Sequence, residues 1–362
     1  MRRFFILCCT CASLCANAQT LTPKGTVIKP TDTHIQYIGR IEDSNPERPA
    51  FTFPGVQIRS GFTGTSIKML AKPNSGYFMA QIDEGEAFKV SFNNTADSIV
   101  TLATALPDAT HQVMVMYVSE GYDRLPEFRG FIVDEGKSLA PDTPMPDRRI
   151  EFIGNSITCG YGVEALEASA PYREETANHY YTYAARTARN LNAQSLVVAR
   201  SGIGVYRNYN GPRTGDKMNM NTEYPHTLLY NKNYQWDFAR YTPHVVCINL
   251  GTNDTSTDGA DPKLLQQGYK NLYQQVRSHY PEAKIVFLCG SMMNGKALDV
   301  AKKAMDTATE QAHKQGDNEV YRFDFTPQNG DLGYGASWHP SYLQQEKMAN
   351  ELTAYLRQLM QW

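Results

Sequence analysis

Four short segments in the second half of the chain hold the residue types that acyl transfer requires. Three follow apolar runs and contain Ser156, Gly202 and Asn253, and the fourth contains His339. A serine hydroxyl becomes a nucleophile when a base takes its proton, and histidine, with an unperturbed pKa of ~6.5, suits that role. The resulting oxyanion needs fixed donors, which the N–H groups of Ser156 and Gly202 and the amide of Asn253 would supply.

Each segment alone has a simpler interpretation. A Gly-Asn-Ser triplet is commonly a turn, an Asn-Asp pair after a strand commonly caps the next helix, and a His-Pro pair commonly lies in a loop. Residues 154–158 are not the Gly-x-Ser-x-Gly elbow, and the glycines at 202 and 204 lack the third glycine of a dinucleotide site. The specific feature is the order Ser, Gly, Asn and then His just before the last helix.

Alternating strands and helices are expected to position these segments. Apolar runs predict strands at residues 149–153, 196–199, 245–250, 285–288 and 321–325. Helical spacing predicts helices near residues 180–191, after the Asp261-Pro262 pair and after Pro340. The alternation predicts an α/β fold with a doubly wound parallel sheet in a flavodoxin-like, three-layer arrangement. Because such sheets gather their chemistry at the carboxyl ends of the strands, the four segments are expected to meet there.

The first half of the chain has a different periodicity. Between residues 31 and 135, apolar and polar residues alternate with a period of two, and Gly, Pro and Asn interrupt the runs at turn-like spacing. This pattern predicts an all-β antiparallel sandwich, a jelly roll. The predicted domains are a signal peptide at residues 1–18, the sandwich at 19–140, a Pro-rich linker at 141–148 and the α/β domain at 149–362.

The N-terminus has the composition of an export signal. Arg2 and Arg3 precede an apolar stretch, and Ala16-Asn17-Ala18 offers the small residues of a cleavage site. We therefore expect an exported protein, periplasmic or secreted. Four of the seven cysteines lie in this segment, and the remaining three form neither a disulfide framework nor a zinc motif. No metal or cofactor is expected.

The composition excludes several classes of protein. The 362 residues carry 35 Lys and Arg against 37 Asp and Glu, for a net charge of −2. This balance argues against a nucleic-acid partner. Beyond the first twenty residues no apolar run approaches the ~18–20 residues that span a bilayer. A hydrophobic content of 41% is typical of a globular protein.

Taken in order, the four segments resemble the blocks of the SGNH (GDSL-like) hydrolase superfamily. They read FIGNSITCGYG at 152–162, SGIGVYRN at 201–208, INLGTND at 248–254 and GASWHPS at 335–341. With YIGR at 37–40 and residues 48–53, the chain looks closer still to carbohydrate esterase family two, whose members pair a jelly roll with an SGNH domain and deacetylate plant polysaccharides. The resemblance implies that Ser156 is the nucleophile, that His339 is the base, and that Gly202 and Asn253 complete the oxyanion hole.

Two features depart from the family pattern. Asn155 stands where the first block has an aspartate, and positions 336 and 337, where an acid commonly orients the histidine, hold Ala and Ser. Three alternatives follow: a backbone carbonyl orients His339, a distant acid such as Asp331 reaches it, or the enzyme is slow or inactive. We favour a Ser–His dyad oriented by a carbonyl, because every other part of the site is present.

Candidate substrate contacts lie beside these blocks. Trp338 is either a platform for a sugar or packing beneath the last helix. Tyr206 and Arg207 follow the oxyanion glycine, although Arg207 could equally be a structural ion-pair partner. Tyr161 is a weaker candidate, and Asp254 is expected to orient its loop rather than to act as a base.

The resulting hypothesis is an exported serine esterase that removes O-acetyl groups from an acetylated carbohydrate through an acetyl-serine intermediate. Two alternatives remain at this stage. One is an SGNH lipase, thioesterase or acyltransferase, which the polar loop at 206–230 disfavours. The other is a carbohydrate-binding protein with a weak or inactive esterase site. The polysaccharide, the hydroxyl position and the oligomeric state are left open by the sequence.

Overall fold

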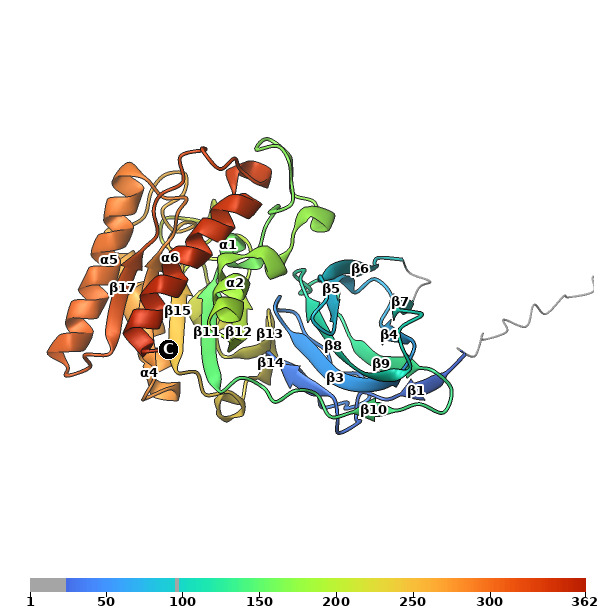
Figure 1. Cartoon of the computed structure of the whole chain (residues 1–362). Coiled ribbons are helices and arrows are strands. Elements are labelled where there is room, and N and C mark those ends of the chain that lie inside the picture. The colour runs from blue at the N-terminus through green and yellow to red at the C-terminus, as the bar shows by residue number, and fades with distance from the viewer. Residues whose placement is uncertain (1–23, 95–97) are drawn as a thin grey trace, which may run out of the picture.

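The computed structural model describes residues 24–94 and 98–362. An antiparallel β-sandwich lies beside an α/β unit, and both stand out in Figure 1. The predicted signal peptide lies outside the described residues. Within the described part of the chain, no helix is both long enough and apolar enough to cross a membrane.

The β-sandwich consists of two antiparallel sheets that enclose one hydrophobic core. One sheet has the strand order β1-β9-β4-β7, and the other has the order β10-β3-β8-β5-β6 with β2 paired to β3. Side chains of β4 alternate between buried and half-buried, as a strand with one face on a core requires. The strand bounds are β1 Thr26–Ile28, β2 Gln36–Ile38, β3 Gln57–Gly64, β4 Ile67–Ala71, β5 Gly76–Ile82, β6 Phe88–Phe92, β7 Ile99–Ala103, β8 Ala109–Tyr117, β9 Phe128–Val133 and β10 Leu139–Ala140.

The α/β unit is built on a five-stranded parallel sheet in the order β12-β11-β15-β16-β17. This order is the flavodoxin-like 2-1-3-4-5 arrangement, so the predicted fold class is confirmed. Its strands are β11 Arg148–Gly154, β12 Ala193–Ala199, β15 Val245–Asn249, β16 Lys284–Cys289 and β17 Val320–Asp324, and a separate hairpin consists of β13 His226–Leu228 and β14 Asn231–Gln235.

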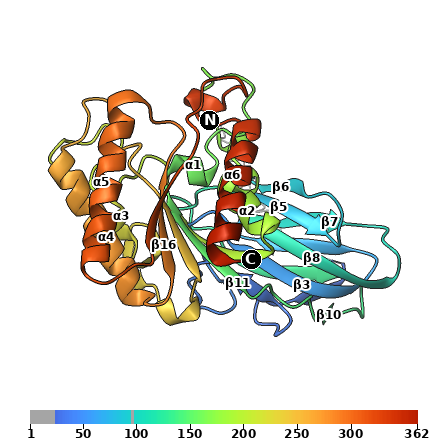
Figure 2. The same cartoon turned by 60° about the vertical axis from the view of Figure 1, so that its left-hand side comes forward.

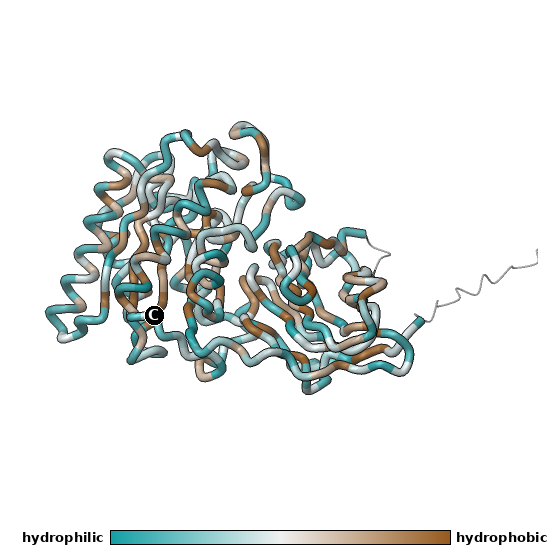
Figure 3. The backbone as a smooth tube through the Cα atoms, viewed as in Figure 1, coloured by the Kyte–Doolittle hydropathy of each residue, from teal (hydrophilic) through white to brown (hydrophobic). Residues whose placement is uncertain are grey.

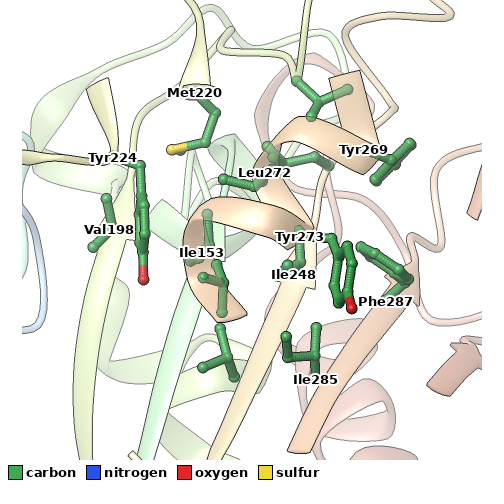
Figure 4. Close-up of a cluster of buried hydrophobic side chains, with 14 of the residues drawn as sticks. Ile153, Val198, Met220, Tyr224, Ile248, Tyr269, Leu272, Tyr273, Ile285 and Phe287 are labelled. Carbon is green, nitrogen blue, oxygen red and sulfur yellow. The ribbon is translucent and has the colours of Figure 1, made fainter. Parts of the chain in front are cut away.

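Helices cover both faces of the parallel sheet, as Figure 2 shows. Helices α4 and α5 pack on one face, against Ile153, Ile248 and Ile285 (Figure 4). Helices α2 and α6 pack on the other face, against Phe152 and Cys247. The α-helices are α1 Ser156–Cys159, α2 Tyr183–Asn190, α3 Met220–Glu223, α4 Pro262–His279, α5 Gly295–Lys314 and α6 Tyr342–Met360, with short 3-10 turns at Glu174–Thr176, His179–Tyr181, Phe238–Arg240 and Ala336–Trp338.

The sequence-based prediction missed several elements of the α/β unit, and the largest of them are α5 and the β13–β14 hairpin. Helix α5 buries mainly small alanines, such as Ala301, Ala304 and Ala308, so its apolar stripe is weak in the sequence. The β13–β14 hairpin has a largely exposed second strand and therefore lacks an apolar run. By contrast, the brown hydrophobic segments of Figure 3 follow the central strands, which the sequence did predict. Asp261 caps α4 and Pro262 is its first residue, as predicted.

Candidate active site

Ser156 lies at the carboxyl edge of the sheet, two residues after the end of β11. Ser156 is the first residue of α1, and the Asn155 side chain caps this helix by accepting a hydrogen bond from the Ile157 N–H at 3.0 Å. Asn155 therefore acts as a helix cap at the position where the family pattern has an aspartate. Gly154 is required by crowding, since a Cβ there would lie 2.0 Å from the Thr158 Oγ1.

The structure brings His339 to Ser156, although 183 residues separate them. The His339 Nε2 lies 2.8 Å from the Ser156 Oγ. The His339 Nδ1 lies 3.0 Å from the carbonyl oxygen of Ala336 and 3.2 Å from that of Ser337. Carbonyl oxygens only accept hydrogen bonds, so Nδ1 carries the proton and Nε2 is free to accept the serine proton.

Of the three alternatives for orienting His339, the structure shows the backbone carbonyl. The two carbonyls belong to the same positions at which the family commonly has an acid. Asp331 instead accepts a hydrogen bond from the Asn329 amide at 2.6 Å. Ala336 is fully buried, and its backbone N–H donates to the carbonyl of Gly162 at 3.0 Å, which fixes the turn.

A strained turn aims these carbonyls at the imidazole. Ser337 and Trp338 both have left-handed backbones, with φ of 49° and 57°. Their N–H groups donate to the carbonyls of Ala170 and Ala168, each at 3.1 Å. A left-handed backbone costs a non-glycine residue about 1–3 kcal/mol. The hydrogen bonds to the loop before the 3-10 turn Glu174–Thr176 thus hold Ser337 and Trp338 in this conformation.

Burial and stacking set the electrostatics of His339. Desolvation lowers the pKa of its imidazole to about 4, against the opposing effect of the two carbonyls. The ring stacks on Tyr161 with centroids 4.2 Å apart, and Tyr161 in turn lies against Tyr172 at 4.6 Å. At neutral pH the imidazole is therefore uncharged and able to act as a base.

The predicted oxyanion residues line one cavity of about 540 Å³ together with Ser156 and His339. Gly202 has a φ of 80°, a left-handed conformation that favours glycine. The Asn253 Nδ2 donates to the carbonyl of Ile203 at 2.8 Å, which leaves its second N–H for an oxyanion. The arrangement has the donors, the nucleophile and the base that acyl transfer requires.

Asp254 holds the loop that follows Gly202. Its carboxylate accepts backbone hydrogen bonds from Val205 at 3.0 Å, Tyr206 at 2.9 Å and Arg207 at 3.0 Å. Asp254 is fully buried and lies outside the cavity lining. These contacts match the predicted orienting role.

The predicted substrate contacts of Tyr206 and Arg207 need correction. Arg207 is 1% exposed, and its guanidinium donates to backbone carbonyls, including that of Gly211 at 2.7 Å. The Tyr206 side chain is buried, and its hydroxyl accepts from the Asp261 N–H at 2.8 Å. Both side chains stabilise loops, because their polar atoms are already hydrogen-bonded inside the protein.

Trp338 is 57% exposed, which excludes packing beneath the last helix. Its indole is free to contact a substrate, and that role stays a prediction. Sequence reasoning did not single out several cavity-lining residues, among them Tyr209, Met292 and Met293. Tyr209 lies one residue beyond the block quoted at 201–208, and the two methionines follow β16 in a segment with no recognisable motif. Among the residues that the structure describes, no cluster of three or more His, Cys, Asp or Glu is arranged to hold a metal.

Comparisons with known families agree with this architecture. Residues 37–144 match the family described as "Carbohydrate esterase 2 N-terminal", and residues 152–347 match the "GDSL-like Lipase/Acylhydrolase family". The first match covers most of the sandwich, and the second covers all four catalytic segments. The boundary between the two matches thus coincides with the change from strand-like to alternating strand and helix patterns in the sequence.

Individual relatives extend over nearly the whole chain. It is 37% identical over 331 residues to "Cellulase/esterase CelE" of Acetivibrio thermocellus, a match that spans 91% of this chain and 40% of that protein. It is 27% identical to an "Acetylxylan esterase / glucomannan deacetylase" of Cellvibrio japonicus, over 97% of this chain and 96% of the relative. A solved family two carbohydrate esterase from Clostridium thermocellum, in complex with cellohexaose, superposes with a TM-score of 0.84 at 36% identity, covering 91% of this chain and 99% of that one.

Proposed function

Because the chain belongs to carbohydrate esterase family two, we propose that it is a serine esterase that removes O-acetyl groups from an acetylated plant-type polysaccharide or oligosaccharide. The observation that carries the proposal is the 2.8 Å contact between the Ser156 Oγ and the His339 Nε2 at the edge of a cavity. The relatives named as acetylxylan esterase and glucomannan deacetylase support the substrate class.

Acylation uses the groups in their observed arrangement. The His339 Nε2 takes the Ser156 proton as the Oγ attacks the acetyl carbonyl carbon. The carbonyl π electrons move to its oxygen, where the N–H groups of Ser156, Gly202 and the Asn253 side chain would stabilise the oxyanion. As the oxyanion collapses, the bond to the sugar oxygen breaks, and His339 gives its proton to that oxygen.

Deacylation repeats these steps with water. The neutral His339 takes a proton from water, whose oxygen attacks the acetyl carbon. Collapse of the second tetrahedral intermediate releases acetic acid and returns the proton to the Ser156 Oγ. A low pKa keeps the imidazole neutral, but it also makes the transient imidazolium costly, since one pKa unit equals about 1.4 kcal/mol.

The direct test is Ser156→Ala in the full chain. We expect the wild type to release acetate from an aryl acetate and from acetylated xylan or glucomannan. Ser156→Ala should lower kcat by at least about 10³-fold, because the nucleophile is absent. Ser278→Ala is a matched control, since Ser278 is exposed on α4 and bonds only locally to the Gln275 carbonyl. Equal activity in Ser156→Ala and the wild type would refute the nucleophile assignment.

The same assay separates the alternatives. A lipase or thioesterase would prefer octanoyl over acetyl esters, and a binding protein would retain acetylated polysaccharide without releasing acetate. We expect neither, because the Ser156–His339 pair is hydrogen-bonded and the loop at 206–230 is polar. Export to the periplasm or medium is proposed on the N-terminal sequence alone.

A further inference from the structure

We propose that Glu120, which belongs to the β-sandwich, is a positioning residue for the oxyanion hole of the α/β domain. This inference rests on the proposed esterase function and assigns the sandwich a part in the chemistry. Glu120 lies shortly after β8, and 81 residues separate it from the loop that it contacts.

Glu120 binds the residue that precedes the oxyanion glycine. The Ser201 backbone N–H donates to its Oε2 at 2.7 Å, and the Ser201 hydroxyl donates to its Oε1. Both carboxylate oxygens therefore bind a single residue. Two hydrogen bonds to one carboxyl group hold both the backbone and the side chain of Ser201 in place.

Fixing Ser201 fixes the donor at position 202. The Gly202 N–H belongs to the peptide unit that joins Ser201 to Gly202, so its direction follows from the placement of these two residues. On its other side, the Gly202 carbonyl accepts from the Tyr209 N–H at 2.8 Å. Glu120 is the anchor from the other domain, whereas Asn253 and Asp254 hold the residues after Gly202 from within the α/β domain.

A carboxylate near a developing oxyanion is unfavourable unless a cation offsets it. Burial raises the pKa of the Glu120 carboxyl, and the hydrogen bonds from Ser201 and the positive charge of Arg200 oppose this effect. The guanidinium lies over the rings of Tyr122 and Tyr230, each at 5.3 Å. Arg200 therefore offsets part of the charge that an ionised Glu120 brings to this side of the site.

The test compares Glu120→Ala and Glu120→Gln in the full chain with p-nitrophenyl acetate as substrate. We expect Glu120→Ala to lower kcat about 10²-fold with KM nearly unchanged, because a misplacement of about 1 Å has that effect on the rate. Glu120→Gln should recover most of the rate, since its amide oxygen still accepts from Ser201. Glu174→Ala is the control. Glu174 and Glu120 line a second, smaller cavity, but Glu174 pairs with Arg124, so its loss should leave kcat unchanged.

A double-mutant cycle with Ser201→Ala identifies the contact. We expect the double variant to lose no more activity than Glu120→Ala alone, since both changes remove the same anchor. A rise in KM with unchanged kcat would mean that Glu120 contacts substrate, and additive losses would mean that it acts elsewhere. Either result overturns the inference, as does full activity of a folded Glu120→Ala. An inactive wild type would instead refute the proposed function.

Discussion

At the scale of single residues, His339 differs from the histidine of a Ser–His–Asp triad in what faces its Nδ1. The carbonyls of Ala336 and Ser337 select the correct tautomer, but they carry no full charge to stabilise an imidazolium. The Tyr161 ring, stacked 4.2 Å away, supplies a polarisable surface on one side of the imidazole. Orientation and tautomer are thus retained, while the electrostatic contribution of the acid is reduced.

This environment predicts an unusual pH profile. Activity requires neutral His339, whose pKa burial lowers to about 4. We therefore expect kcat/KM to stay level from neutral pH down to about pH 5 and to fall towards tenfold per unit below about pH 4, as the imidazole takes a proton. The measurement is aryl acetate hydrolysis over pH 3–8, with circular dichroism at each pH to confirm that the protein is folded. A midpoint near 6.5 would contradict the assigned environment.

At the scale of elements, the site depends on loops that leave the carboxyl ends of β11, β12 and β15. Asp254 connects two of these loops, because it follows β15 and accepts three backbone N–H groups from residues after β12. An aspartate has enough acceptor positions for all three, whereas an asparagine presents one oxygen and one NH₂ group. The Asp254 carboxylate therefore joins the loop that contains Gly202 to the loop that contains Asn253.

Asp254→Asn tests this connection. We expect a loss of about 1–3 kcal/mol in the free energy of unfolding, since at least one buried N–H loses its acceptor. We also expect kcat to fall about tenfold, because the oxyanion donors move apart. Urea unfolding and aryl acetate kinetics measure the two effects. Asp258→Asn, at an exposed position of the same loop, should change neither, and an equal effect there would refute the assigned role of Asp254.

At the scale of the whole molecule, a buried ion pair joins the two domains. Arg40 of the sandwich is fully buried, and its guanidinium donates to Glu151 of β11 at 3.2 Å and to the carbonyl of His226 at 2.8 Å. The rings of Tyr224 and Trp236 lie over it at 4.9 and 5.4 Å. The YIGR segment at 37–40, which resembles the family, therefore contains the arginine that joins the two domains.

Arg40→Ala should destabilise the chain strongly. Removal of one partner leaves the Glu151 carboxylate buried without its counter-ion, which costs about 3–5 kcal/mol. The expected result is a lower urea midpoint, with aryl acetate activity retained below the transition because Arg40 lies outside the cavity lining. Arg48→Ala removes the same charge from an exposed position and should leave the midpoint unchanged. Equal midpoints for both variants would show that the ion pair adds no stability.

The amino-acid sequence alone predicted the fold class and located the four segments whose residues line the cavity. It could do so because strand and helix periodicities are local, and because each segment lies next to an apolar element whose end is visible in the residues. The order of the β11, β12 and β15 segments then placed Ser156, Gly202 and Asn253 at one sheet edge.

The folded chain was needed to show what orients His339, why Arg207 is unavailable to substrate, and that Glu120 binds Ser201. The physical reason is the same in each case. Every residue has a backbone carbonyl, so the residue type at 336 or 337 cannot reveal where that carbonyl points. Burial and contacts between domains depend on segments far apart in the chain, whose approach no local pattern encodes.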